Sequence, residues 1–111
     1  MVLPDIVGMN VISENWGNEL DDFWIVVQVD IGPQNGKGSE TFTFNVTSPK
    51  RLKLVLEGSH IEIGRGLLIM DDYNKKTVQE TVRRLVEKCK GETWDEVVLA
   101  LCRYAYWEYE N

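Results

Sequence analysis

The chain has very few of the residues that most often carry nucleophilic or metal chemistry. Its 111 residues include one histidine, His60, and two cysteines, Cys89 and Cys102. A structural zinc centre needs about four ligands, mostly cysteine and histidine, and this set is too small to provide them. Both cysteines fall on apolar positions of helical patterns, which favours two reduced, buried thiols over a disulfide. We therefore expect neither a metal nor a cofactor.

Long hydrophobic runs and a surplus of positive charge are also missing. No stretch of about 18 apolar residues is present, which argues against a transmembrane helix. The N-terminal MVLPDIVGMN has no basic segment followed by an apolar one, so we expect no signal peptide, no membrane contact and a cytoplasmic location. With 12 Lys and Arg against 18 Asp and Glu, the net charge of −6 argues against a nucleic-acid partner. It suits a basic protein partner, or simple solubility.

The chain does contain several alternating apolar segments that are typical of β-strands. Its length fits one domain, spanning residues 1–111. Segments 6–12, 23–31 and 41–47 have strand character, and the glycine-rich loop at 32–38 joins the second to the third as a β-hairpin. Segment 60–70 predicts a fourth strand with a kink near Gly64, and the tail after Arg103 predicts a last one.

The second half of the chain changes to a helical period. Apolar residues from Val78 to Cys89 recur at helical spacing, and a second apolar stripe begins at Trp94. Segment 50–57 stays open, because Ser48 and Pro49 suit a helix start whereas its leucines also alternate as in a strand. We predict an α+β fold with an antiparallel sheet of about four or five strands and two consecutive C-terminal helices packed on one face.

The stretch CKGETWDE, residues 89–96, places a thiol beside carboxylates and a tryptophan. Its pattern is also that of a boundary between two helices. Gly91 suits a left-handed residue that ends the first helix. Thr93 suits the N-cap of the second, with Glu96 completing a capping box in which its carboxylate reaches back to the Thr93 N–H. We interpret the stretch as structural.

Other candidates for chemistry are weak. A dyad of His60 with Ser59 or a cysteine would need a third group that orients the base, and none is evident. The pairs Asp21-Asp22 and Asp71-Asp72 are more typical of turns and helix starts than of acid–base work. The glycine-rich loop precedes a strand and not a helix, as a phosphate-binding loop would. The sequence therefore predicts a protein that is not an enzyme.

Several motifs follow one another in a characteristic order. They include the run from Phe42 to Leu52 with its Ser48-Pro49, and Gly64-Arg65 before Leu68-Ile69. The most specific are the Cys89-to-Glu96 stretch and the later Trp107-Glu108-Tyr109. In these motifs, which lie within residues 23–110, the chain resembles the immunity protein 8 family of bacterial toxin–immunity systems. It departs from the family pattern at Arg51, where an aromatic residue is frequent.

The resemblance implies a cytoplasmic protein that is encoded beside a toxin and blocks it by binding. Toxins of such systems include those delivered by contact-dependent inhibition, and many are basic nucleases. An acidic inhibitor can cover a positively charged cleft. The alternative, from a different class, is a small regulatory domain whose loop at 32–39 holds a metabolite.

The residues that we expect to contact the toxin are surface carboxylates outside the helix caps, together with aromatic side chains. Charge complementarity speeds association, and exposed tryptophans often carry interface energy. The candidates are Glu19, Asp21, Asp22, Glu57, Glu62, Trp16 and Trp107.

Overall fold

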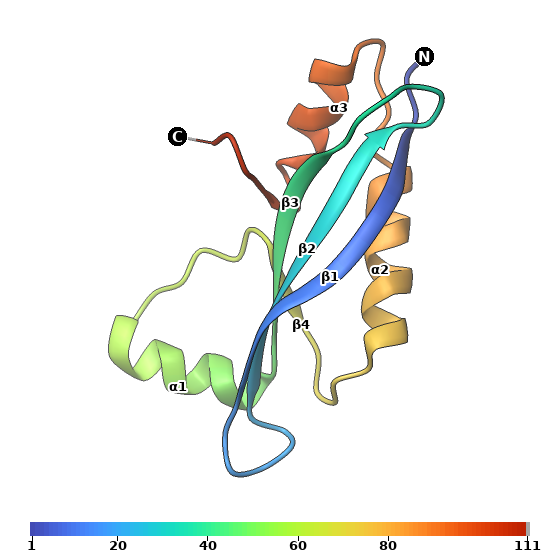
Figure 1. Cartoon of the computed structure of the whole chain (residues 1–111). Coiled ribbons are helices and arrows are strands. Elements are labelled where there is room, and N and C mark those ends of the chain that lie inside the picture. Colours follow the sequence, from blue (N-terminus) through green and yellow to red (C-terminus); the bar gives the residue numbers. More distant parts are fainter. Residues whose placement is uncertain (111) are drawn as a thin grey trace.

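A computed structural model describes residues 1–110 of the chain. Along the chain the elements are β1 (Pro4–Trp16), β2 (Phe23–Pro33), β3 (Glu40–Thr47), α1 (Pro49–Ser59), β4 (Leu67–Ile69), α2 (Lys75–Glu87), α3 (Trp94–Leu101) and β5 (Tyr106–Trp107). The predicted α+β class is confirmed: a five-stranded sheet carries α2 and α3 on one face (Figure 1). None of the helices in this part of the chain has the length and apolar character that crossing a membrane requires.

The sheet has the strand order β1-β2-β3-β4, and β5 also pairs with β3. The prediction of antiparallel strands holds for β1–β2, β2–β3 and β3–β5. It is wrong for β4, which runs parallel to β3. Antiparallel strands can be joined by a short hairpin, whereas a parallel neighbour needs a crossover connection. Here α1 lies in that connection and leads the chain away from the end of β3, and residues 60–66 return it to the sheet beside Asn45 (Figure 1).

The core lies between the sheet and the two C-terminal helices. Alternate residues of β2 and β3 point to this side, and they meet the apolar stripes of α2 and α3 at helical spacing. Cys89, just after α2, is buried there as well. The fully enclosed side chains include Phe23, Ile25, Val27, Val29, Ile31, Phe42, Phe44, Val46, Val82 and Val97.

The helix starts follow local capping signals. Asn74 caps α2 by accepting from the Thr77 N–H at 3.1 Å, and Thr93 caps α3 by accepting from the Glu96 N–H at 3.2 Å. The return bond of the predicted capping box differs, because the Glu96 carboxylate accepts from the N–H of Glu92 at 2.7 Å and not from that of Thr93. The prediction that Thr93 is the N-cap of α3 is therefore confirmed. The prediction that Glu96 bonds the Thr93 N–H is wrong, because Glu96 bonds the N–H of the preceding residue.

Gly91 has a different role from the predicted one. Its φ is not positive, and α2 ends before it with Lys88 as a right-handed C-cap. Gly91 instead exchanges two backbone hydrogen bonds with Val2, of 2.6 and 3.2 Å. A Cβ at this position would lie 2.8 Å from Cβ of Glu96. The glycine is needed because another side chain lies close to it, and long-range pairing with the N-terminus fixes its conformation.

Two predicted strands have other limits. β1 is longer than the predicted 6–12, because polar residues up to Trp16 continue its ladder with β2, with irregularities between Ile6 and Gly8 and between Val11 and Ser13. The predicted strand at 60–70 is reduced to Leu67–Ile69. Residues 60–66 alternate in polarity as a strand would, but they pair with no other strand of the described chain.

Candidate functional site

The candidate site is the end of the molecule where the turn at residues 17–22 meets α1 (Figure 1). The open question about segment 50–57 is settled as a helix, which Ser48 caps. Its buried hydroxyl accepts hydrogen bonds from the N–H of Arg51, at 3.1 Å, and of Phe23, at 3.2 Å. Pro49 follows in the first turn, where a missing N–H has no cost. One hydroxyl thus ties the start of α1 to the start of β2.

Lys50, in the first turn of α1, holds two of the predicted carboxylates. Its Nζ lies 2.7 Å from Glu19 and 3.4 Å from Asp21. These side chains remain largely open to solvent, with 69% of Glu19 and 60% of Asp21 exposed. The hydrogen bond to Glu19 raises the pKa of Lys50 above its ordinary value. Both carboxylates therefore keep a solvent-facing side that a partner can reach.

Arg51 holds the third carboxylate in a more enclosed setting. Its Nε donates to Asp22 at 2.5 Å and its Nη1 donates to Asn15 at 2.7 Å. Only 16% of the Arg51 side chain and 15% of the Asp22 side chain are exposed. Asp22 is thus engaged within the chain, where it locks the turn onto α1.

Glu57 and Glu62 lie at and after the C-terminal end of α1, away from the ion pairs of its first turn. Glu57 is in the last turns of α1 and Glu62 follows the helix, and both are exposed. Neither has an ion-pair partner within residues 1–110. From Lys50 to Glu57 the helix rises by roughly 10 Å. α1 therefore brings both predicted acidic groups to the same end of the molecule.

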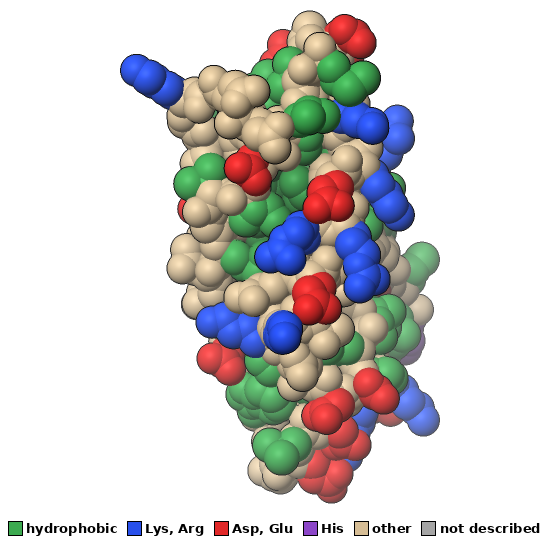
Figure 2. Space-filling model, turned by 90° about the vertical axis from the view of Figure 1, so that its right-hand side faces the viewer, with side chains coloured by type: hydrophobic (Ala, Val, Ile, Leu, Met, Phe, Trp, Pro, Cys, Tyr) green, Lys and Arg blue, Asp and Glu red, His purple; other side chains and the backbone are tan. Residues whose placement is uncertain are grey.

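The charged side chains are segregated on the surface. Figure 2 shows carboxylates gathered at the lower end, where the turn at 17–22 lies, and Lys and Arg side chains along the side that α2 forms. Segments 14–22 and 49–63 hold six carboxylates against three cations. Half of the 12 Lys and Arg residues lie between Lys75 and Lys90. The end that contains α1 is therefore net negative, and the side that α2 forms is net positive.

The two tryptophan candidates lie apart. Trp16 is 38% exposed at the acidic end, where its ring packs 5.2 Å from that of Phe23. Trp107 is half-buried and pairs with Phe42, at the opposite end of β3. Its indole Nε1 donates to Glu40 at 3.2 Å.

Glu40 was not singled out from the sequence, yet it explains two of the family-like motifs. The indole N–H of Trp94 and that of Trp107 both donate to its carboxylate. This joins α3 and the C-terminal segment to the start of β3. Glu40 lies far from both tryptophans in the sequence. The only sequence signal was that each indole N–H, when buried, needs an acceptor, and this does not identify which residue provides it.

A set of exposed apolar side chains near α1 was also missed. Ile61 and Ile63 are each 78% exposed, and Leu54 of α1 is 47% exposed. Alternation of Ile61 and Ile63 with polar residues predicted a half-buried strand, but nothing in the described chain covers them. The alternating pattern of Ile61 and Ile63 is visible in the sequence, but it was interpreted as a strand that packs on the core.

The two cysteines are in settings that oppose nucleophilic chemistry. Burial raises the pKa of Cys102 to about 11 and also raises that of Cys89, which favours the unreactive thiol form. Both cysteines are free of disulfides. His60 is the left-handed C-cap of α1, with a φ of 64°. Within the described part of the chain, no three His, Cys, Asp or Glu side chains cluster as metal ligands would.

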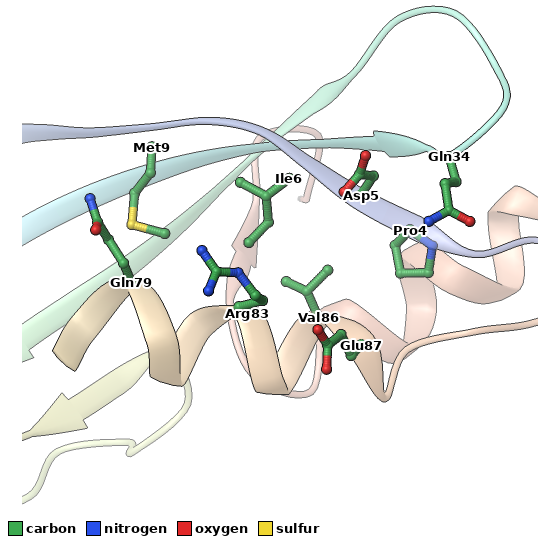
Figure 3. Close-up of a pocket in the computed structure, with 9 residues that line it drawn as sticks. All are labelled: Pro4, Asp5, Ile6, Met9, Gln34, Gln79, Arg83, Val86 and Glu87. Carbon is green, nitrogen blue, oxygen red and sulfur yellow. The ribbon is translucent and has the colours of Figure 1, made fainter. Parts of the chain in front are cut away.

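The cavities are open grooves. One, of about 380 Å³, lies between β1 and α2, where Arg83 and Gln79 face Ile6 and Met9 (Figure 3). Another of similar volume adjoins the loop at 32–39, beside Lys37. Metabolite sites usually enclose most of their ligand within apolar walls. Neither groove has that form, so neither favours the metabolite-binding alternative.

Comparison with known proteins gives one match. The model of a family described as immunity protein 8 matches residues 6–111, which is nearly the whole chain. No curated protein and no solved structure matches. Because the family model covers far more than half of the sequence, the chain belongs to the immunity protein 8 family.

Proposed function

We propose that this protein is the inhibitor of a bacterial toxin domain encoded beside it, and that it acts in the cytoplasm by covering the toxin without catalysing a reaction. Membership of the immunity protein 8 family is the observation that carries the proposal. The high thiol pKa of Cys102 agrees with a role in binding alone, because a nucleophilic cysteine needs its thiolate form.

The toxin surface that this protein meets is basic, and a nuclease delivered by contact-dependent inhibition is the toxin class that we favour. A nuclease contacts phosphates through Lys and Arg side chains, so its active cleft is positive. The acidic end of this protein has a complementary charge, in which Glu19, Asp21, Glu57 and Glu62 face solvent. Opposite charges of this kind steer two proteins together and raise the association rate.

The direct test is co-expression with the toxin domain encoded immediately upstream. Cells that produce the toxin domain alone should lose viability, and this protein should restore it. Purified together, the two proteins should form a complex, and the toxin should lose activity at an equimolar amount of inhibitor. A toxin domain that stays active with excess inhibitor, and forms no complex, would contradict the proposal.

Charge reversal tests the electrostatic part separately. Glu57→Lys with Glu62→Lys should slow association and flatten its dependence on salt, because exposed charges act within a Debye length of about 10 Å at 0.1 M salt. Glu87→Lys with Glu92→Lys is the matched control, since it makes the same change of charge on exposed residues outside the α1 end. Equal association rates for both double variants would show that the acidic end does not steer the toxin.

A further inference from the structure

α1 is held at its first turn and is otherwise poorly covered. None of its 11 residues is fully buried: Leu52, Val55 and Leu56 are half-buried, and Leu54 is 47% exposed. Helices this short are marginally stable in water unless they pack an apolar face against something. The helix extends away from the sheet beyond its anchored start (Figure 1). Its outer part therefore has apolar surface that the chain itself does not bury.

The segment after α1 continues this surface. Ile61 and Ile63 are among the most exposed apolar residues of the protein, each at 78%. The backbone N–H groups of residues 61–64 have no acceptor within residues 1–110. Exposed backbone N–H groups are hydrogen-bonded by water, but neighbouring large apolar side chains that face solvent are typical of a surface that a partner covers.

Gly58 gives an independent indication of a partner. It lies in the last turn of α1, one helical turn after Leu54 and on the same face. Its φ is not positive, and a Cβ added to it would meet nothing within 4 Å. Neither backbone conformation nor space requires glycine there, and alanine would favour the helix. A glycine on a helix surface does allow another molecule to approach the backbone closely.

The charges on this surface identify the kind of partner. Glu57 and Glu62 alternate with the apolar residues and form no ion pair in the described chain. An apolar centre with unpaired carboxylates around it is complementary to a basic protein surface that has an apolar patch. A second copy of this acidic surface would instead bring like charges together.

We propose that the toxin domain docks on the outer face of α1 and the segment that follows it, and this rests on the proposed immunity function. The docking face consists of Leu54, Glu57, Gly58, Ile61, Glu62 and Ile63. Anchoring of the first turn by Lys50 and Arg51 presents it in a fixed position, which lowers the entropy cost of binding.

Gly58→Arg is the decisive variant. Arginine is a better helix former than glycine and meets open space, so the free protein should be at least as stable as the wild type. Its bulk and charge should nevertheless weaken binding to the upstream-encoded toxin domain by about 30-fold or more, as loss of a central contact does. Leu99→Arg, at a 71% exposed position of α3, is the control and should bind normally.

A second variant, Ile61→Ser with Ile63→Ser, removes the apolar centre from a segment outside the core without changing its charge and should weaken binding to a similar extent. If the wild type binds and both variants bind equally well, the docking face is wrong and the immunity function stands. If the wild type itself fails to bind, the proposed function has failed. If light scattering shows a wild-type dimer that Gly58→Arg dissociates, a second copy covers the face and the inference is overturned.

Discussion

The ion pair between Arg51 and Asp22 should stabilise the fold far more than its neighbour between Lys50 and Asp21. Removing one partner of a buried pair costs about 3–5 kcal/mol, whereas exposed pairs contribute about 0–1 kcal/mol. Asp22 and Arg51 are 15% and 16% exposed, and Arg51 would keep its bond to Asn15. We therefore expect Asp22→Asn to lower the free energy of unfolding by about 2–3 kcal/mol.

Asp21→Asn is the control, because its carboxylate is 60% exposed and lies 3.4 Å from Lys50. It should cost less than about 0.5 kcal/mol. Urea unfolding measures both: with an m-value of about 1–3 kcal/mol/M, Asp22→Asn should lower the midpoint by about 1 M at an unchanged slope. Equal midpoints for the two variants would refute the assignment of Asp22 to the scaffold that fixes α1.

Three further outcomes follow from local structure. Thr93→Ala should lower the free energy of unfolding by about 0.5–2 kcal/mol in urea unfolding, through loss of the N-cap of α3. Alkylation of Cys102 should be slow at pH 7 and rise as the pH approaches its pKa of about 11; fast labelling of the folded protein at pH 7 would contradict burial. Arg65 lowers the pKa of Glu110, so this contribution to stability is complete above the ordinary carboxyl pKa of 4.5 and disappears as the pH falls through the lowered value. Glu110→Gln should therefore lose less stability on acidification than the wild type.

Features that depend on neighbouring residues could be predicted from the sequence. The alternation of β2 and β3 follows from one buried face, and the burial of Phe23 and Phe42 confirms it. The N-caps Ser48 and Thr93 each act on an N–H three residues later, so their signal is contained within one turn. These local rules gave the fold class, the limits of β2 and β3 to within two residues, and the start of α3.

Features that depend on distant residues could not. β4 is parallel to β3 because of how the chain crosses over, and a strand's own pattern does not name its partner. The conformation of Gly91 is set by pairing with Val2, at the other end of the chain. Ile61 and Ile63 alternate with polar residues as strand residues do. Such a pattern shows that one side of the segment is apolar, but not whether the rest of the chain covers that side.

The same limit applies to the candidate site. Composition identified the acidic residues, but not that Asp22 is held by Arg51, which is 29 residues away. The exposure of Leu54 and the open space around Gly58 are three-dimensional properties that appear only when α1 is placed against the sheet. The carboxylates could therefore be predicted as candidates. The sequence could not show that Asp22 is bonded within the chain whereas Glu57 and Glu62 face solvent.

Hydrogen exchange with and without the upstream-encoded toxin domain tests most directly whether the protein acts by binding through its α1 end. The amides of residues 61–64 have no hydrogen-bond acceptor within the described chain, so in the free protein they should exchange rapidly. On addition of the toxin domain, exchange should slow in residues 53–64, while α2 should be unaffected. Slowed exchange along α2 and β1 alone, or no change anywhere, would contradict the account.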